Sequence, residues 1–105
     1  ILALALVIVS VLAISIPAFA ADYTWRYSDD ELYTNSGESQ HIMNLQSDLN
    51  IFLRNTKQSQ ITVDGYFGQN TKNAVIKFQN ANNLSPDGRV GPLTKNALYS
   101  YYLSH

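Results

Sequence analysis

A first helix is predicted over about 39–54, where four apolar residues recur at spacings of 3, 4 and 3: Ile42, Leu45, Leu49 and Phe52. These spacings place the four side chains on one face of an α-helix. Ser39 is the expected N-cap, because its hydroxyl can accept a bond from the first unpaired N–H groups. Asn55 is expected to end the helix in the left-handed conformation.

Two further helices are predicted, from about Gln69 to Asn82 and from Pro92 to about Tyr102. Proline favours the first helical position, where a missing N–H costs nothing. The inner face of the second helix is expected to carry Thr71, Ala74, Val75 and Phe78. The stretch Ile61-Thr62-Val63 before it is β-prone. The expected fold class is all-α, a small three-helix bundle.

A twelve-residue segment occurs twice, at 64–75 and again 23 positions later at 87–98. Aspartate, two glycines, threonine, lysine, asparagine and alanine are identical in the two copies, and the match continues to Phe78 and Tyr101. Internal repeats reveal the architectural unit of a domain. We therefore expect two Asp-Gly loops, each followed by a helix.

Each repeated position has an expected role in folding. Asp-Gly makes a tight turn in which the carboxylate accepts backbone N–H groups, and the glycine adopts a conformation that other residues avoid. An apolar residue plugs the core, a second glycine precedes the helix where a side chain would crowd the turn, and a threonine bonds back to the loop. The structural motif residues are Asp64, Gly65, Phe67, Gly68, Thr71, Asp87, Gly88, Val90, Gly91 and Thr94.

Residues 1–20 have the features of a signal peptide. Ile1–Ile16 are apolar apart from two serines, Pro17 breaks the run, and Ala18-Phe19-Ala20 fits cleavage after Ala20. No basic residue precedes the run, so we expect a truncated n-region. The alternative is a membrane anchor, since about 20 apolar residues span a bilayer. Either interpretation sends the rest of the chain out of the cytoplasm.

Residues 21–40 are expected to form an acidic linker that contains aromatic residues, ahead of a domain at 41–105. From Asp22 to Gln40 five acids and one base give a net charge of −4, whereas the remainder carries +3. This weak basic balance argues against nucleic acid and is compatible with an anionic polymer such as cell wall. Tyr23, Trp25 and Tyr27 alternate like a strand edge. The segment is either flexible, with aromatics resting on the domain, or an extended strip for a sugar chain.

The repeated pattern resembles the peptidoglycan-binding domain 1 family, a three-helix module of bacterial cell-wall hydrolases and related exported proteins. The resemblance runs from about Ile42 to Tyr101, and the family's usual glycine after the first helix is replaced by a polar connection at 55–60. The residues that carry the resemblance are Leu45-Gln46, Leu49, Val63-Asp64-Gly65-Tyr66-Phe67-Gly68, Thr71, Ala74-Val75, Phe78-Gln79, Leu84, Asp87-Gly88-Arg89-Val90-Gly91, Thr94 and Ala97-Leu98.

The sequence offers little for catalysis. It contains no cysteine and two histidines, His41 and the terminal His105, and no cluster with metal-ligand spacing, so neither a metal nor a cofactor is expected. Asp29-Asp30-Glu31 invites comparison with a glycosidase acid pair, but neighbouring carboxylates on a linker are not held at a productive distance. Asp64 and Asp87 are expected to cap turns.

Candidate ligand-binding residues lie where the two copies differ. Tyr66 and Arg89 share one slot, and Gln69 and Asn70 open the second helix, whose unpaired N–H groups favour anions and carbonyls. Gln46 and Gln79 follow core residues and are expected to bond loop backbone.

The resemblance implies a non-catalytic exported module that binds peptidoglycan, through its glycan or its stem peptide, in the cell wall, periplasm or medium. It would act alone or as the targeting part of a cell-wall hydrolase. The alternatives are a protein-interaction or inhibitory domain that docks on a partner enzyme, and an enzyme working through the acidic segment.

Overall fold

The computed structural model describes residues 24–28 and 30–105, so the predicted signal peptide lies outside the described residues. The described elements are α2 (Thr24–Tyr27), α3 (Ser39–Asn55), α4 (Gln69–Ala81) and α5 (Pro92–Ser104). No strand occurs in this part of the chain, where one isolated antiparallel bridge joins Leu32 to Val90. The all-helical prediction is therefore confirmed, and its three long helices start where the sequence placed them.

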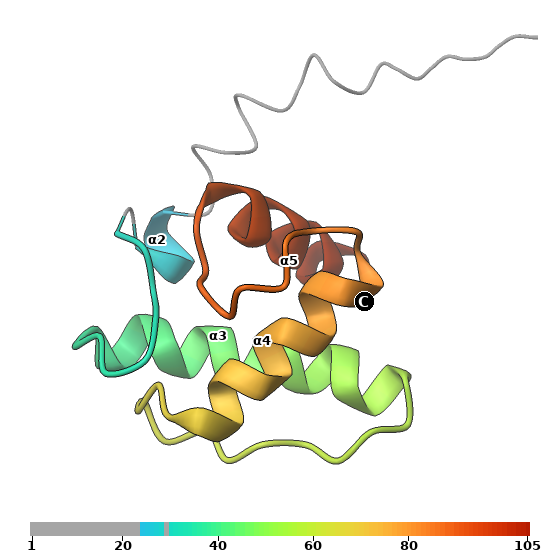
Figure 1. Ribbon diagram of the computed structural model, residues 1–105, viewed down its shortest axis with the longest axis horizontal. Coiled ribbons are helices and arrows are strands. Elements are labelled where there is room, and N and C mark those ends of the chain that lie inside the picture. The colour runs from blue at the N-terminus through green and yellow to red at the C-terminus, as the bar shows by residue number, and fades with distance from the viewer. Residues whose placement is uncertain (1–23, 29) are drawn as a thin grey trace, which may run out of the picture.

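Helix α3 is central, because it contacts α2, α4 and α5. In the view of Figure 1, α4 crosses in front of α3 and α5 lies above it. The apolar faces predicted for the first two helices are buried, and the loop residues Phe67 and Val90 are completely buried as core plugs. At the far end of the bundle, Phe52 and Phe78 meet edge to face with ring centroids 5.2 Å apart, and Tyr101 packs against both. The core thus joins all three long helices and both repeat loops.

The expected N-cap of α3 is wrong by one residue. The carbonyl of Glu38 accepts the first helical bond, from the amide of Ile42 at 2.9 Å, which makes Glu38 the cap and Ser39 the first helical residue. The Glu38 side chain caps nothing and lies 3.1 Å from the ring of His41 instead.

The left-handed residue after α3 is Lys57 (φ 61°) rather than Asn55. The helix continues to Asn55 because the amides of Lys57 and Gln58 satisfy the last carbonyls, with Gln58 N donating to Leu53 O at 2.8 Å. Asn83 (φ 58°) ends α4 in the same way, and the amide of Leu84 donates to the carbonyl of Gln79 at 2.9 Å. Both helices therefore close with a Schellman motif.

The β-prone stretch 61–63 forms no strand. Asn50 on α3 holds it by two bonds of 2.8 Å, one to the amide and one to the carbonyl of Ile61. A side chain thus takes the place of a partner strand, and the long connection between α3 and α4 runs along the bundle.

The described part of the expected linker packs on the domain. Residues 24–27 are helical, not a strand edge, and both Tyr27 and Leu32 are completely buried in the core. Asp48 of α3, 1% exposed, accepts two bonds from Arg26 at 2.6 and 2.7 Å and another from the hydroxyl of Tyr27. Such a carboxylate requires partners to offset its lost hydration, and this segment supplies them. Residues 31–36, which we call the strap, continue from it to α3 (Figure 1).

Over residues 24–28 and 30–105, no helix combines the length and apolar character needed to cross a membrane.

Candidate functional site

The first Asp-Gly loop is held by Gln46, which is completely buried on α3. Its amide nitrogen donates to Asp64 Oδ1 and to the carbonyl of Tyr66, and its oxygen accepts from the amides of Asp64 and Gly65, all at 3.0 Å. The same nitrogen lies 3.0 Å from Thr71 Oγ1. The prediction that Gln46 bonds loop backbone is confirmed.

Gln79 of α4 does the same for the second loop. Its amide nitrogen lies 3.1 Å from Asp87 Oδ1, 2.9 Å from the carbonyl of Arg89 and 3.1 Å from Thr94 Oγ1, and its oxygen accepts from Gly88 N at 3.0 Å. The two loops are thus fixed from inside by equivalent glutamines, each on the helix that precedes its loop.

Both aspartates act within their turns. Asp64 Oδ1 accepts from Tyr66 N at 3.0 Å, and Asp87 Oδ1 accepts from Arg89 N at 2.9 Å. These backbone bonds are the main reason that the pKa of each carboxyl lies below its ordinary value. Carboxylates that stay ionised and are engaged in this way suit turn formation, not proton transfer.

The glycines of the motif differ in what they require. Gly65 and Gly88 have φ values of 77° and 76°, which residues with a Cβ rarely adopt. A Cβ on Gly68 would lie 2.7 Å from the ring of Tyr66. The expected crowding does not hold at Gly91, where the nearest atom would be Glu31 Oε2 at 3.7 Å. A Cβ at Gly91 would therefore make only an ordinary van der Waals contact.

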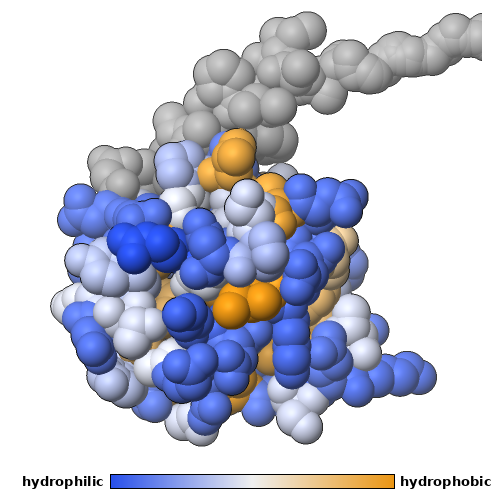
Figure 2. All heavy atoms as spheres, in the orientation of Figure 1, coloured by the Kyte–Doolittle hydropathy of each residue, from blue (hydrophilic) through white to orange (hydrophobic). Residues whose placement is uncertain are grey.

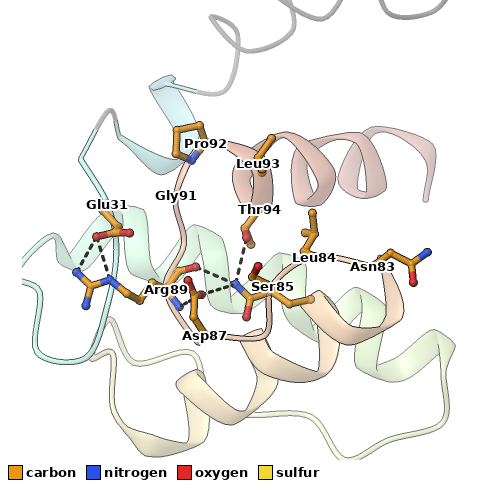
Figure 3. Close-up of a pocket in the computed structure, with 11 residues that line it drawn as sticks. Glu31, Asn83, Leu84, Ser85, Asp87, Arg89, Gly91, Pro92, Leu93 and Thr94 are labelled. Atoms are coloured by element: carbon orange, nitrogen blue, oxygen red, sulfur yellow. Dashed lines mark hydrogen bonds and ion pairs between the residues drawn. The ribbon is translucent and has the colours of Figure 1, made fainter. Parts of the chain in front are cut away.

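The two loops form two equivalent hollows. The first, about 200 Å³, lies over the start of α4, and the second, about 390 Å³, lies over the start of α5 (Figure 3). Every residue that lines the first has its counterpart 23 positions later in the second. The first is lined by Thr62, Asp64, Tyr66, Gly68, Gln69, Asn70 and Thr71, and the second adds Glu31, Gln79, Asn83 and Leu84.

The structure divides the four candidate ligand-binding residues between these hollows. Tyr66, Gln69 and Asn70 line the first, whereas Arg89 lies in the second. Tyr66 is 59% exposed, and the side-chain Nε2 of Gln69 donates to Asn73 Oδ1 at 2.9 Å. The first hollow therefore presents a phenol and amides, and the second presents a guanidinium beside apolar residues.

The strap lies across both loops and joins them at equivalent positions. Its Leu32 exchanges two backbone bonds with Val90, at 3.2 and 2.8 Å, and the amide of Asn35 donates to the carbonyl of Phe67 at 2.9 Å. Phe67 and Val90 are the two plug residues of the repeat. The strap is thus bonded to both loops, and its Glu31 lines the second hollow.

Strap side chains also contact Tyr66 and Arg89, which occupy equivalent positions in the two copies of the repeat. The hydroxyl of Tyr66 donates to Asn35 Oδ1 at 2.9 Å. Arg89 donates to Glu31 Oε1 from Nε at 3.0 Å and from Nη2 at 2.6 Å, and its guanidinium carbon lies 4.6 Å from the ring centre of Tyr33. Glu31 is therefore paired, not simply solvated.

Sequence reasoning missed these strap residues. The acidic, aromatic composition of 21–40 beside a mildly basic domain was the available signal, and it did not indicate which acid meets which base. Lys95, a repeated residue given no role, is 1% exposed and donates to the carbonyls of Ser28, at 2.7 Å, and Asp30. It anchors the chain just before the strap.

The face of the molecule in Figure 2 is largely hydrophilic, with apolar residues in small separate spots. In the part of the chain that the structure describes, no group of three or more acidic or histidine side chains could hold a metal ion. What the loops offer chemically is two small hollows with polar rims, suited to contacts with a polar ligand.

Two curated proteins show local similarity. Over 32 residues the chain is 66% identical to a protein of Kitasatospora aureofaciens named "Uncharacterized protein in bpoA1 3'region", a match that covers 30% of this chain and 27% of that protein. Over 41 residues it is 49% identical to the zinc D-Ala-D-Ala carboxypeptidase of Streptomyces albus G, which covers 39% of this chain and 16% of the enzyme. The chain thus matches about a quarter of the first relative's length and about a sixth of the second's.

No solved structure matches the chain. The sequence profile described as "Putative peptidoglycan binding domain" matches residues 38–98, which is more than half of the chain and includes α3, α4, both loops and the start of α5. The chain belongs to this family of peptidoglycan-binding domains.

Proposed function

We propose that this protein is an exported, non-catalytic module that binds peptidoglycan of the bacterial cell wall, alone or as the targeting part of a cell-wall hydrolase. The observation that carries the proposal is the pair of equivalent hollows, with Tyr66 at one and Arg89 at the other, in a chain of this family.

The chemistry of the hollows suits this polymer. Peptidoglycan presents sugar faces with C–H groups, many amides and hydroxyls, and the carboxylates of its stem peptides. The exposed ring of Tyr66 suits a sugar face, Gln69 and Asn70 suit amides and hydroxyls, and Arg89 suits a carboxylate. We propose these four residues as ligand contacts.

The absence of a catalytic role is supported by how the carboxylates are used. Asp64 and Asp87 bond their own turns, and Glu31 pairs with Arg89. The carboxypeptidase relative is a much longer protein, of which this chain matches 16%. We propose that the shared segment serves attachment to the wall, in keeping with the family.

Export through a signal peptide at 1–20 is part of the same proposal. Sequencing the N-terminus of the secreted protein should find Ala21, and a membrane-bound product that retains residues 1–20 would favour an anchor. We propose that the domain extends before residue 41 to about residue 26, because Arg26, Tyr27 and Leu32 contact the bundle.

The test is co-sedimentation with insoluble peptidoglycan at low salt. We expect retention with a dissociation constant of about micromolar to millimolar, because the hollows are shallow and small. Protein that remains in the supernatant would contradict the proposal, and release of soluble wall fragments would instead indicate an enzyme.

A double variant tests the contact residues. Tyr66→Ala with Arg89→Gln should reduce retention while leaving helicity unchanged. The matched control is Arg54→Gln with Leu103→Ala, which removes one exposed cation and one exposed apolar side chain that line neither hollow. Equal retention of the two double variants would remove Tyr66 and Arg89 from the site.

A further inference from the structure

The second hollow contains a carboxylate that the chain itself supplies. Glu31 reaches Arg89 across 58 positions of sequence, and one of its oxygens accepts both Nε–H and Nη2–H (Figure 3). The side chains of Arg89 and Glu31 are 49% and 44% exposed. A guanidinium fork matches a carboxylate in geometry and charge, so Arg89 is already arranged to bind one.

This pairing is easily exchanged. Exposed ion pairs contribute little because water and salt compete for both partners, so a carboxylate from outside can replace Glu31 at small cost. Arg89 would keep its orientation, since its guanidinium lies over the Tyr33 ring and its backbone is bonded to Asp87 and Gln79. The cation is held by contacts that do not depend on Glu31.

The rest of the second hollow is suited to a small apolar group beside that carboxylate. Leu84, Pro92 and Leu93 line it, with Leu93 73% exposed, and Asn83 and Ser85 provide polar atoms. In Figure 3, Glu31 and Arg89 lie at one side of the hollow and Leu84 and Asn83 at the other. Its volume, about 390 Å³, falls in the range of small-ligand pockets, about 300–1,000 Å³.

The first hollow lacks this combination. It carries Tyr66 where the second carries Arg89, and its helix opens with Gln69 and Asn70 where the second has proline and leucine. No residue that lines it is basic. The two copies therefore differ in charge at the one position where a ligand carboxylate would be recognised.

We propose that the second hollow binds the carboxylate end of a short peptide with small apolar side chains, and that Glu31 occupies Arg89 until this carboxylate replaces it. The inference rests on the proposed function, because it identifies a stem-peptide terminus as the group bound at Arg89. It assigns to Glu31 the role of an internal competitor and to the two hollows different ligand groups.

The test compares N-acetyl-alanyl-alanine with the same dipeptide ending in a carboxamide, titrated into the labelled protein and followed by amide and arginine Nε resonances. We expect the acid to shift the signals of Arg89, Leu93 and Thr94, and the amide to bind at least tenfold more weakly. Equal binding of acid and amide, or no shift at these residues, would overturn the proposal.

Two variants separate the roles. Arg89→Gln should abolish the preference for the acid. Glu31→Gln should strengthen acid binding about two- to fivefold, in proportion to the small contribution of an exposed pair. Asp30→Asn removes the neighbouring exposed carboxylate, whereas Arg89 pairs with Glu31, so this variant should change affinity by less than the Glu31 variant.

Unchanged amide signals of Leu32 and Val90 would show that the strap is intact in the Glu31 variant. Weaker binding with these signals unchanged would overturn the competitor role. If that variant lost the strap, the acid-to-amide comparison in the unmodified protein would still decide the proposal. Retention on wall without acid preference would defeat this inference alone, whereas loss of wall retention would defeat the proposed function.

Discussion

Gln46 and Gln79 lie on different helices and bind their Asp-Gly loops through four equivalent hydrogen bonds. Each donates to the loop aspartate, to the carbonyl of the residue after the loop glycine (Tyr66 or Arg89) and to the threonine in the first turn of the next helix, and each accepts from the amide of the loop glycine. Because both amides are almost completely buried, each loop is shaped from inside the protein. Its outward residues are consequently the ones available for binding.

Replacement of Gln46 should be costly. Gln46→Ala leaves loop amides and a carboxylate without their partner, and we expect the free energy of unfolding to fall by about 2–4 kcal/mol. Gln40→Ala on the exposed side of the same helix should cost less than about 0.5 kcal/mol. Urea denaturation measures both, and a similar loss for the two variants would contradict the role of Gln46.

The loop glycines should differ from the helix-preceding glycine of the second copy. Gly65→Ala forces a side chain into a positive φ and places its Cβ 2.4 Å from Ser39 Oγ, so we expect a loss of about 1–3 kcal/mol. Position 91 has room for a Cβ and an ordinary φ of −94°, so Gly91→Ala should lower the free energy of unfolding by less than about 1 kcal/mol. Thermal unfolding would reveal the order, and a larger loss at Gly91 would reject it.

Stability should fall at alkaline pH because of Tyr27. Burial, first, and the neighbouring Asp48 raise the pKa of its phenol above the ordinary value near 10. Above pH of about 10 the unfolded chain releases this proton while the folded protein retains it, so stability is complete below that pH and declines as pH rises. Tyr27→Phe should flatten the alkaline decline in denaturant titrations, whereas Tyr33→Phe on the exposed strap should preserve it.

Stability should also fall at acid pH through the two turn aspartates. Backbone hydrogen bonds lower the pKa of Asp64 and Asp87 in the folded protein. Their contribution is present above the unfolded pKa, near 3.9, and is lost as pH falls through the lower folded values. Asp64→Asn with Asp87→Asn should make the slope of unfolding free energy between about pH 2 and 5 shallower. An unchanged slope would mean that other groups control acid unfolding.

Lys95 should govern how firmly the strap is attached. Lys95→Met removes the ammonium that bonds the carbonyls of Ser28 and Asp30, and the first of these bonds is buried, where an acceptor that loses its donor costs stability. We expect faster hydrogen exchange at the amide of Leu32 and lower stability, by about 1–3 kcal/mol. Lys77→Met on the exposed side of α4 is the control. Equal exchange rates in the two variants would show that the strap is held mainly by its other contacts.

Much of the site's framework was predictable because it depends on local rules. The repeat placed the Asp-Gly turns, the plugs and the starts of α4 and α5, and the position of Gln46 and Gln79 beside core residues indicated their inward role. The residues that end the helices were harder to predict. Lys57, rather than Asn55, took the left-handed position, because the hydrogen bonds that close the last helical turn outweighed the preference of asparagine for that conformation.

The amino-acid sequence by itself determined the three long helices, the two loops and the family, since periodicity and repetition record which residues must face a core. Only the tertiary structure decided the role of residues 26–28 and 30–36. Asp48 and Lys95 lie inside the fold and bind partners far away in sequence, and Glu31 meets Arg89 only after the strap crosses both loops. Long-range pairing of charges leaves no periodic signal along a chain, so the sequence alone did not show that this segment packs across both loops and contributes Glu31 to the second hollow.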